Sequence, residues 1–258
     1  MAARTITLHA FRAGTGKTTL LANIAVSLTL QGKRIGVVDA DVHAPGLHIL
    51  FGLPNPRPTL NDYLWDEVGL DKIVTRFKDD RLPHEIIAVP ASSRLDDILR
   101  MLREGFDCSL LYTGLRALGE RYQLDYLLVD TPPGFHSEAL IIAIASNLIL
   151  ITLPPDEQDL AGTLLLLDAI RRRGEPPTFL LLNKLPAQHS SYGEALVRQA
   201  RAHYGLEVMG SVPYEEGVAL LASRGVFALQ HPQHPWSQHI DQVAARILDF
   251  DFQPGILP

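Results

Sequence analysis

The residues best suited to chemistry lie in a glycine-bearing stretch near the N-terminus. Gly14 and Gly16 can turn backbone N–H groups inward, and Lys17 follows them directly. The ammonium group of Lys17 could reach the β- and γ-phosphates of a nucleotide, and the Thr18 hydroxyl could ligate Mg²⁺. An apolar strand precedes the loop, and the helix after it presents its positive N-terminal end. These residues indicate a site for a nucleoside triphosphate.

Carboxylates at the ends of two predicted strands form a second group. The apolar strand Lys33–Val38 ends in Asp39 and Asp41, at the sheet edge where α/β proteins bind ligands. A later apolar strand, Leu124–Val129, delivers Asp130 in the same way. Each of these strand ends, taken alone, could instead be a turn with solvated carboxylates.

The glycine-bearing loop departs from the strict P-loop pattern, because Phe11 stands where that pattern has its first glycine. The loop resembles the deviant Walker A motif of the MinD/ParA ATPase family, Lys-Gly-Gly-x-Gly-Lys-Thr-Thr. Arg12 and Ala13 occupy the positions of the first Lys and the first Gly of that motif. The rest of the motif corresponds to Gly14, Thr15, Gly16, Lys17, Thr18 and Thr19. A chance Gly-Lys-Thr loop with a solvated Arg12 is the alternative.

The resemblance implies an ATPase that uses Mg²⁺ and forms an ATP-sandwich homodimer. In the family, the first Lys reaches across the dimer to the partner's nucleotide, so Arg12 is the departure with the most consequence. Arginine keeps the positive charge, but it is longer and carries a planar donor fork. We therefore expect Arg12 to assist catalysis in trans, beside Lys17 in its own site.

The resemblance also assigns the carboxylates and the base-recognition residues. Asp130 matches the Walker B aspartate, which holds Mg²⁺ through water, and Asp41 matches the aspartate that activates the attacking water. Asp39 is expected to support the metal shell, with Thr18, or the loop. Asn183, at the end of the predicted strand Thr178–Leu182, matches the base-recognising asparagine, although a turn-forming role fits it nearly as well. Pro213 is expected beside the nucleotide.

Composition limits the class of protein. The chain has 258 residues, 47% of them apolar, so it can bury one large core, and we expect one ATPase domain over residues 1–258 with a short C-terminal tail from about residue 250. The net charge of −6 gives no general attraction to nucleic acid or anionic lipid. Cys108 is the one cysteine of the sequence, which excludes an intrachain disulfide framework and argues against the family's iron–sulfur carriers. No signal peptide is visible, so a cytoplasmic protein is expected.

Strands and helices alternate along the chain, without a linker or an internal repeat. This pattern predicts an α/β fold with one doubly wound, mostly parallel sheet flanked by helices, as in P-loop NTPases. Further strands are expected at 85–89, 147–153 and 208–212, and helices at 18–30, 59–64, 94–104, 109–123, 160–171 and 194–204, with a terminal amphipathic helix from Trp236.

The sequence says less about binding partners other than a second copy of this chain. Arg171, Arg172 and Arg173 suit the C-terminal end of a helix, and with Arg198, Arg201 and Arg224 they could instead form a nonspecific DNA surface on the nucleoid. The tail from Asp251 has no Lys or Arg, so an anionic membrane would not attract it. His231, His234 and His239 match no rigid metal-binding spacing and are expected in a surface loop.

The function implied by the resemblance is a nucleotide-driven switch. ATP binding would create the dimer, hydrolysis would reset it, and an activating protein partner would time the cycle. Its cargo could be a division site, DNA or a protein organelle such as the carboxysome. Two alternatives stay open: a nucleotide-sensing scaffold with little hydrolysis, and a regulatory ATPase of the kind that sets flagellar number.

Overall fold

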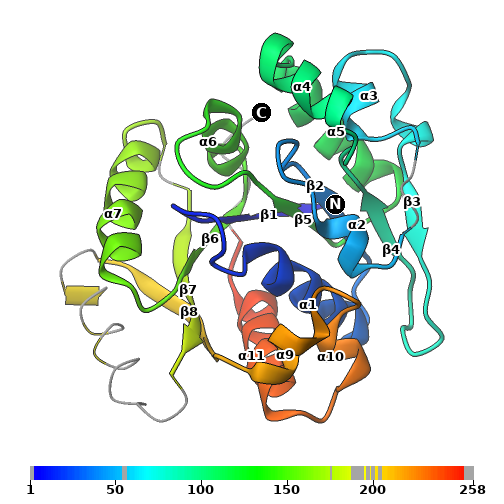
Figure 1. Ribbon diagram of the computed structural model, residues 1–258. Helices are drawn as coiled ribbons and strands as arrows, with labels where there is room; N and C mark the ends of the chain where they lie inside the picture. Colours follow the sequence, from blue (N-terminus) through cyan, green and yellow to red (C-terminus); the bar gives the residue numbers. More distant parts are fainter. Residues whose placement is uncertain are drawn as a thin grey trace.

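The computed structural model describes residues 3–53, 57–174, 176–186, 195, 198, 201–202 and 205–252. In this part of the chain, an eight-stranded sheet has the order β3-β4-β2-β5-β1-β6-β7-β8 (Figure 1). All neighbouring strands are parallel except β3, which runs antiparallel to β4 at one edge. The strands are β1 Arg4–His9, β2 Ile35–Asp39, β3 Thr75–Phe77, β4 Ile86–Val89, β5 Tyr126–Asp130, β6 Leu148–Leu153, β7 Thr178–Leu185 and β8 Glu207–Pro213.

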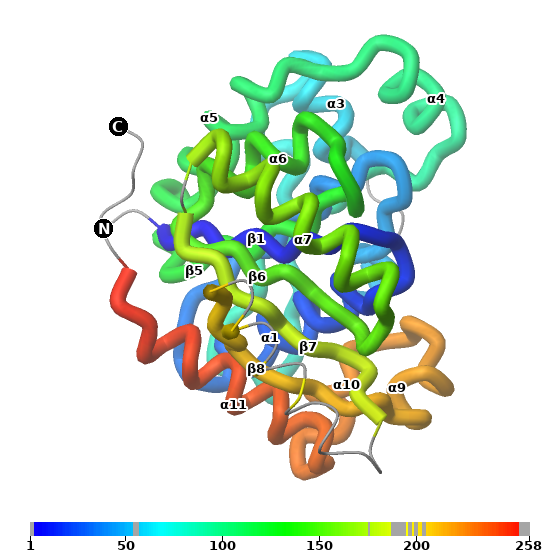
Figure 2. Tube along the Cα trace, turned by 90° about the vertical axis from the view of Figure 1, so that its left-hand side faces the viewer, coloured from blue at the N-terminus to red at the C-terminus, as the bar shows by residue number. Residues whose placement is uncertain are grey.

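The inner strands are apolar on both faces because helices cover both sides of the sheet. In β6, Leu148 and Leu150 face one layer, whereas Ile149 and Ile151 face the other. Successive side chains of a strand point to opposite faces, so a strand buried on both sides becomes a continuous apolar run. Figure 2 shows the two helical layers. On one side lie α5 (Cys108–Arg121), α6 (Ser137–Ile144) and α7 (Glu157–Arg171), and on the other lie α1 (Lys17–Leu30) and α11 (Pro235–Asp249).

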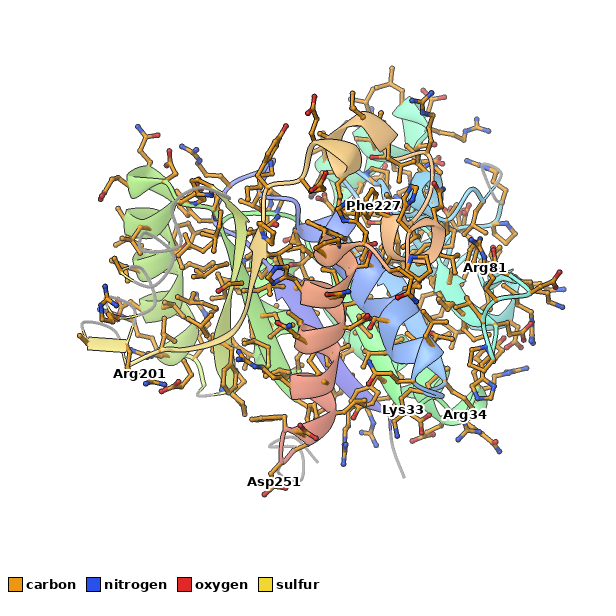
Figure 3. The ribbon with its side chains drawn as sticks, turned by 90° about the horizontal axis from the view of Figure 1, so that it is seen from below. Lys33, Arg34, Arg81, Arg201, Phe227 and Asp251 are labelled. Atoms are coloured by element: carbon orange, nitrogen blue, oxygen red, sulfur yellow. The ribbon has the colours of Figure 1, made fainter. Side chains whose placement is uncertain are left out.

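Helices α1 (Lys17–Leu30) and α11 (Pro235–Asp249) lie side by side across one face, as Figure 3 shows. Because α11 covers the outer side of α1, nearly all of α1 is buried. Two polar side chains of α1 also have partners: Asn23 Oδ1 accepts from the Ala228 amide at 2.7 Å, and the Ser27 hydroxyl donates to Asp241. Phe227, in α10 (Phe227–Gln230), packs edge-to-face on Trp236 of α11.

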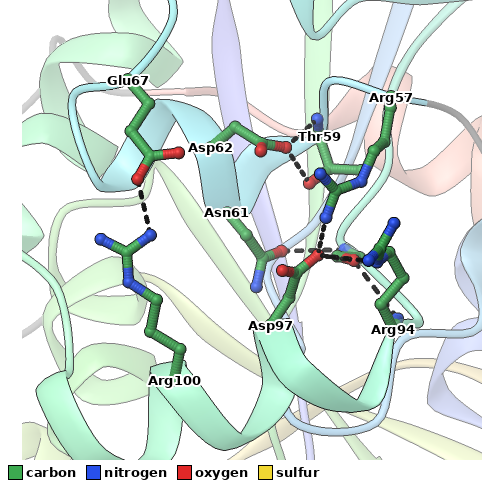
Figure 4. A network of polar contacts seen from close by, with 9 residues as sticks. Arg57, Thr59, Asn61, Asp62, Glu67, Arg94, Asp97 and Arg100 are labelled. Carbon is green, nitrogen blue, oxygen red and sulfur yellow. Dashed lines mark hydrogen bonds and ion pairs between the residues drawn. The ribbon is translucent and has the colours of Figure 1, made fainter.

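On the opposite face, α6 (Ser137–Ile144) and α7 (Glu157–Arg171) cover the strands around β6. Helices α3 (Leu60–Leu64) and α4 (Leu95–Glu104) lie beyond α5 and are joined by the polar network of Figure 4. Asn61 accepts from the Ser92 amide at 2.8 Å, and Arg57 donates to Asp97 at 2.6 Å. Short helices α2 (Leu47–Leu50) and α9 (Glu216–Leu221) and the 3₁₀ turn Leu70–Lys72 complete the described elements.

The predicted fold class is confirmed, and most element boundaries agree within three residues. The predicted helix 194–204 and the tail beyond residue 252 lie largely or wholly outside the described residues. The stripe of the terminal helix is core, as expected: Trp236, Ile240, Val243 and Ile247 are buried. Phe250 packs edge-to-face on Phe179. None of the helices in the described ranges has both the length and the apolar content needed to cross a membrane.

Candidate nucleotide site

The glycine-bearing loop joins the middle of the sheet to α1. Strand β1 lies between β5 and β6, and α1 begins at Lys17 directly after the loop. Gly14 and Gly16 have φ values of 80° and 89°, in the left-handed region where residues with a Cβ are strained. A Cβ on Gly16 would also lie 2.4 Å from Asn183 Nδ2. The left-handed φ therefore favours glycine at position 16, and a Cβ there would also displace the Asn183 amide.

The carboxyl end of β7 holds this loop from the outside. The Asn183 side chain donates from Nδ2 to the Thr15 carbonyl at 2.7 Å, and Lys184 Nζ donates to the Gly14 carbonyl at 2.6 Å. Strand β7 continues to Leu185, three residues past the predicted end, but Lys184 has a left-handed φ of 57° and lies at an irregularity in the pairing with β8. Sequence reasoning found Asn183 but missed Lys184, whose signal was its place next to Asn183.

Lys17, Thr18 and Asp130 form a closed cluster beneath the loop. Lys17 Nζ pairs with one carboxylate oxygen of Asp130, and the Thr18 hydroxyl donates to the other at 2.6 Å. The side chains of Lys17 and Asp130 are 7% and 1% exposed, so water screens this ion pair little. The two residues come from distant parts of the sequence and meet because β1 and β5 are neighbouring parallel strands.

Asp39 and Asp41 occupy the end of β2, next to this cluster. Asp39 is in register with Asp130 across β2 and β5. One Asp39 oxygen accepts from the Gly46 and Leu47 amides at 3.0 and 2.9 Å, which fixes the start of α2. Asp41 accepts from the Ala44 amide at 3.1 Å and lines the cavity above the loop. Of the two roles expected for Asp39, the contacts correspond to support of the loop.

If all of them were ionised, the buried carboxylates would carry more negative charge than Lys17 can balance. Burial, together with the nearby charge of Asp130, raises the pKa of Asp39 to about 8. Burial also raises the pKa of Asp130, against the opposing effect of Lys17. A divalent cation would remove this penalty, and carboxylate and hydroxyl oxygens are the ligands that Mg²⁺ prefers. Thr18 and Asp130 therefore fit the role of Mg²⁺ holders.

His9, at the end of β1, is a buried titratable group that sequence reasoning missed. Its Nδ1 lies 2.8 Å from the Thr131 hydroxyl, and its side chain is fully buried. Burial, together with the positive charge of Lys17, lowers the pKa of His9 to about 3. The neutral ring therefore adds no charge beneath the glycine-bearing loop. A histidine closing an apolar strand was the one signal available in the sequence.

Arg12 is bound to the start of α7 in its own chain. Its guanidinium donates to Gln158 Oε1 at 2.6 Å and to Asp159 Oδ2 at 3.1 Å, and Asp156 lies 3.7 Å away. The Arg12 side chain remains 43% exposed. Phe11, beside it, lies against Gly162 of α7 and packs edge-to-face on Phe135. The predicted departure from the family motif is thus a residue with three partners in cis.

A cavity of about 520 Å³ opens over the loop and extends toward α9 and α11. The structure brings most of the predicted nucleotide-binding residues to its wall, whereas Asp39 and Asp130 lie below it in the sheet. This volume is in the usual range for small-molecule and cofactor sites. The predicted site residues that line it are Arg12, Ala13, Gly14, Thr15, Gly16, Lys17, Thr18, Thr19, Asp41, Asn183 and Pro213.

Known proteins share this sequence pattern and this fold. The CbiA family model, described as the CobQ/CobB/MinD/ParA nucleotide-binding domain, matches residues 6–228. An uncharacterised ATP-binding protein of Methanocaldococcus jannaschii is 24% identical over 249 residues, which cover 96% of this chain and 89% of that protein. An iron–sulfur cluster carrier protein of Pseudomonas fragi is 27% identical over 243 residues, covering 87% and 78%.

A solved structure gives the corresponding similarity in three dimensions. The septum site-determining protein MinD of Pyrococcus horikoshii OT3, in complex with Mg-ADP, superposes with a TM-score of 0.79. The match covers 95% of this chain and 96% of that one, at 20% sequence identity. At this level of identity the likeness shows a common fold.

Proposed function

The chain belongs to the CobQ/CobB/MinD/ParA nucleotide-binding family, and from this membership and the site geometry we propose that it binds ATP with Mg²⁺ and hydrolyses it. The observation that carries the proposal is the buried cluster of Lys17, Thr18 and Asp130 directly under a loop with two left-handed glycines. A triphosphate gives Lys17 a new anionic partner in place of Asp130. Mg²⁺, when bound, neutralises charge on the phosphates.

Asp41 is the residue we assign to the attacking water. It lines the cavity, and the Ala44 amide holds one of its oxygens at 3.1 Å, which fixes the carboxylate at the cavity wall. Asn183 and Pro213 also line the cavity and would contact the base. Asp39 is buried away from the cavity and would act through the loop that carries Asp41.

Replacement of Asp41 tests this assignment. An Asp41→Ala variant should bind Mg-ATP with affinity near that of the wild type and release phosphate at least about 100-fold more slowly, the usual contribution of a positioned acid or base. Asp80→Ala, at an exposed position, is the matched control and should hydrolyse normally. Phosphate release and binding of a fluorescent ATP analogue are measured on the same samples. Near-normal turnover by the Asp41 variant would assign the water to another residue.

We further propose that ATP binding drives homodimerisation and that the dimer positions or partitions an intracellular cargo in the cytoplasm, with a protein partner activating hydrolysis. Support comes from the family and from Arg12, a partly exposed cation that lines the cavity. Nonspecific DNA stays an alternative surface. Arg172 and Arg201 each pair with a carboxylate, but exposed pairs of this kind contribute little and would not prevent phosphate contacts.

The contacts of Arg12 also favour a second candidate, a nucleotide-sensing scaffold with little hydrolysis. For Arg12 to reach a partner's nucleotide, its guanidinium must leave Asp156, Gln158 and Asp159. If those contacts persist with ATP bound, nucleotide binding would order the loop and α7 without a trans contact. Under this candidate, the nucleotide would control a partner through the start of α7.

Two substitutions separate the switch from the scaffold. In the switch, Arg12→Ala should bind ATP and stay monomeric in light scattering, whereas Asp159→Asn, which removes the charge of one of the three partners of Arg12, should still dimerise with ATP. In the scaffold, both substitutions remove the same contact in cis, so they should alter dimerisation equally or not at all. Arg172→Ala is the matched control, because Arg172 is an exposed arginine paired to Asp168 of α7. ATP-dependent dimerisation of Arg12→Ala would contradict the trans contact.

A further inference from the structure

Three metal-ligating side chains meet outside the phosphate site. They are His43 in the loop after β2, His136 directly before α6, and Glu138 in the first turn of α6. One ligand atom from each residue lies within 4.8 Å of the other two. Residues 43 and 136–138 are far apart in the sequence, and the meeting of the two loops brings them together. The cluster therefore joins the loop of Asp41 to the loop that follows Asp130.

The separations suit a small divalent cation. Glu138 Oε1 lies 3.2 Å from His43 Nε2 and 3.6 Å from His136 Nδ1. Ligand atoms at about 2.0–2.1 Å from a tetrahedral Zn²⁺ ion are about 3.3 Å from one another. The two distances to Glu138 are already close to this value, and the two rings, whose centroids are 5.3 Å apart, can approach by rotation of the half-exposed His136.

The polar groups around His43 are incompletely satisfied. His43 Nδ1 is buried and has no hydrogen-bond partner in the described part of the chain. Nε2 is the nitrogen that faces Glu138, so a cation in this cluster would bind Nε2, and Nδ1 would carry the ring proton. Glu138 is the anionic partner: burial opposes its ionisation, but its own amide, His43 and Ser137 donate to it and lower its pKa. A carboxylate held in its ionised form is available as a ligand.

The donor set distinguishes the class of metal. Two imidazole nitrogens and one carboxylate oxygen suit Zn²⁺ and similar borderline ions, whereas Mg²⁺ prefers oxygen ligands alone. We propose that His43, His136 and Glu138 bind a divalent cation of the Zn²⁺ class, which ties together the loops that carry Asp41 and Gly134. Three protein ligands leave a fourth position open to water. The site is independent of the ATP function proposed above, because none of its ligands belongs to the phosphate cluster.

Metal binding is tested without nucleotide. Protein that carries no histidine tag is stripped with a chelator and titrated with Zn²⁺ against a competing indicator dye, in excess Mg²⁺ to fill oxygen-only sites. The wild type should bind one equivalent of Zn²⁺, and Co²⁺ should give the absorption spectrum of tetrahedral coordination. His43→Ala, His136→Ala and Glu138→Gln should each weaken Zn²⁺ binding at least about tenfold. Loss of a residue that only supports a metal ligand already lowers the affinity by about this factor, and loss of a ligand itself should cost at least as much.

The controls decide between this site and adventitious binding. His84→Ala removes an exposed histidine elsewhere and should leave Zn²⁺ binding unchanged. His136→Ala is the most informative substitution, because its side chain is 47% exposed and its loss should not disturb folding, which circular dichroism checks. The proposal is overturned if the wild type binds Zn²⁺ no more tightly than the His136 variant, or if His84→Ala weakens binding to the same extent.

Discussion

Asp130 shows how a single residue can depend on the arrangement of the whole sheet. Its two oxygens contact Lys17 and Thr18, and its backbone carbonyl accepts from the Ala40 amide at 2.8 Å. The first two contacts hold the side chains of Lys17 and Thr18, and the third holds the loop that carries Asp41. Loss of the Asp130 carboxylate would leave the Lys17 ammonium buried without its partner, which is strongly destabilising in a protein interior.

His9 makes a prediction about pH at the residue scale. Its pKa is about 3 in the folded protein and 6.5 when unfolded, so the unfolded chain takes up a proton first as pH falls. The stability from neutral His9 is fully present above pH 6.5 and is lost as pH falls toward 3. Between pH 7 and pH 5 the free energy of unfolding should decrease by about 2 kcal/mol through this residue.

Urea unfolding at the two pH values measures this effect, without nucleotide or metal. Other groups titrate in the same range, so the quantity of interest is the difference between wild type and His9→Gln, which has no titratable ring. Between pH 7 and pH 5, the free energy of unfolding should decrease by about 2 kcal/mol less in His9→Gln than in the wild type. His84→Gln, at an exposed position, should behave like the wild type. Equal pH dependence in wild type and His9→Gln would show that His9 titrates normally.

At the scale of elements, α7 and the glycine-bearing loop pack closely against each other at Gly162. A Cβ on Gly162 would lie 2.0 Å from the ring of Phe11, a residue of the loop. Glycine normally costs a helix about 1 kcal/mol relative to alanine, so its presence here reflects the space that the ring occupies. The same contact connects the loop to the helix whose first turn holds Arg12.

Gly162→Ala should therefore destabilise the protein, although alanine is the better helix former. The ring of Phe11 must move, and overpacking of this kind costs about 1–3 kcal/mol. ATP affinity should fall too, because Phe11 displaces the loop. Denaturant unfolding and ATP titration measure both effects. Gly69→Ala is the matched control, since nothing lies within 4 Å of the added Cβ. A Gly162 variant that is more stable than the wild type would contradict the packing argument.

Sequence patterns predicted the elements that are defined by apolar periodicity. Strands β5 and β6 are continuous apolar sequences, and α11 has apolar residues at helical spacing along one face. Few other secondary structures would bury so many apolar residues, so these elements could be predicted. The short helices α2 and α10 were missed, since four residues carry no period. The start of α2 depends on Asp39, whose carboxylate accepts from the Gly46 and Leu47 amides. These amides lie seven and eight residues after Asp39 in the sequence.

The candidate site was predictable where a local motif exists. The loop from Arg12 to Thr19 has such a motif, and Asp41 and Asp130 end apolar strands. The partners of Arg12, the contact of Lys184 with Gly14 and the cluster around Glu138 have no local signal. Each of them joins segments that only the fold brings together, so the sequence gives no spacing from which to infer them.

At the scale of the whole molecule, the cavity connects the first and last parts of the chain. Its wall includes the β1–α1 loop, the end of β7, and residues of α9, α10 and α11. Helix α1 is in addition packed between the sheet and α11. A ligand in this cavity would therefore contact elements that contribute to one core, and its binding free energy should stabilise the fold as a unit.

The most direct measurement of the central claim is the stabilisation of the protein by Mg-ATP. At a ligand concentration of 100 times Kd, the wild type should gain about 2.7 kcal/mol of stability, seen as a rise in Tm. Lys17→Ala should lose most of this rise, and Lys78→Ala, whose side chain is 74% exposed, should keep it. Comparing each variant with and without ligand removes any change in its own stability. A wild type that Mg-ATP does not stabilise, or an equal rise in Lys17→Ala, would contradict the account.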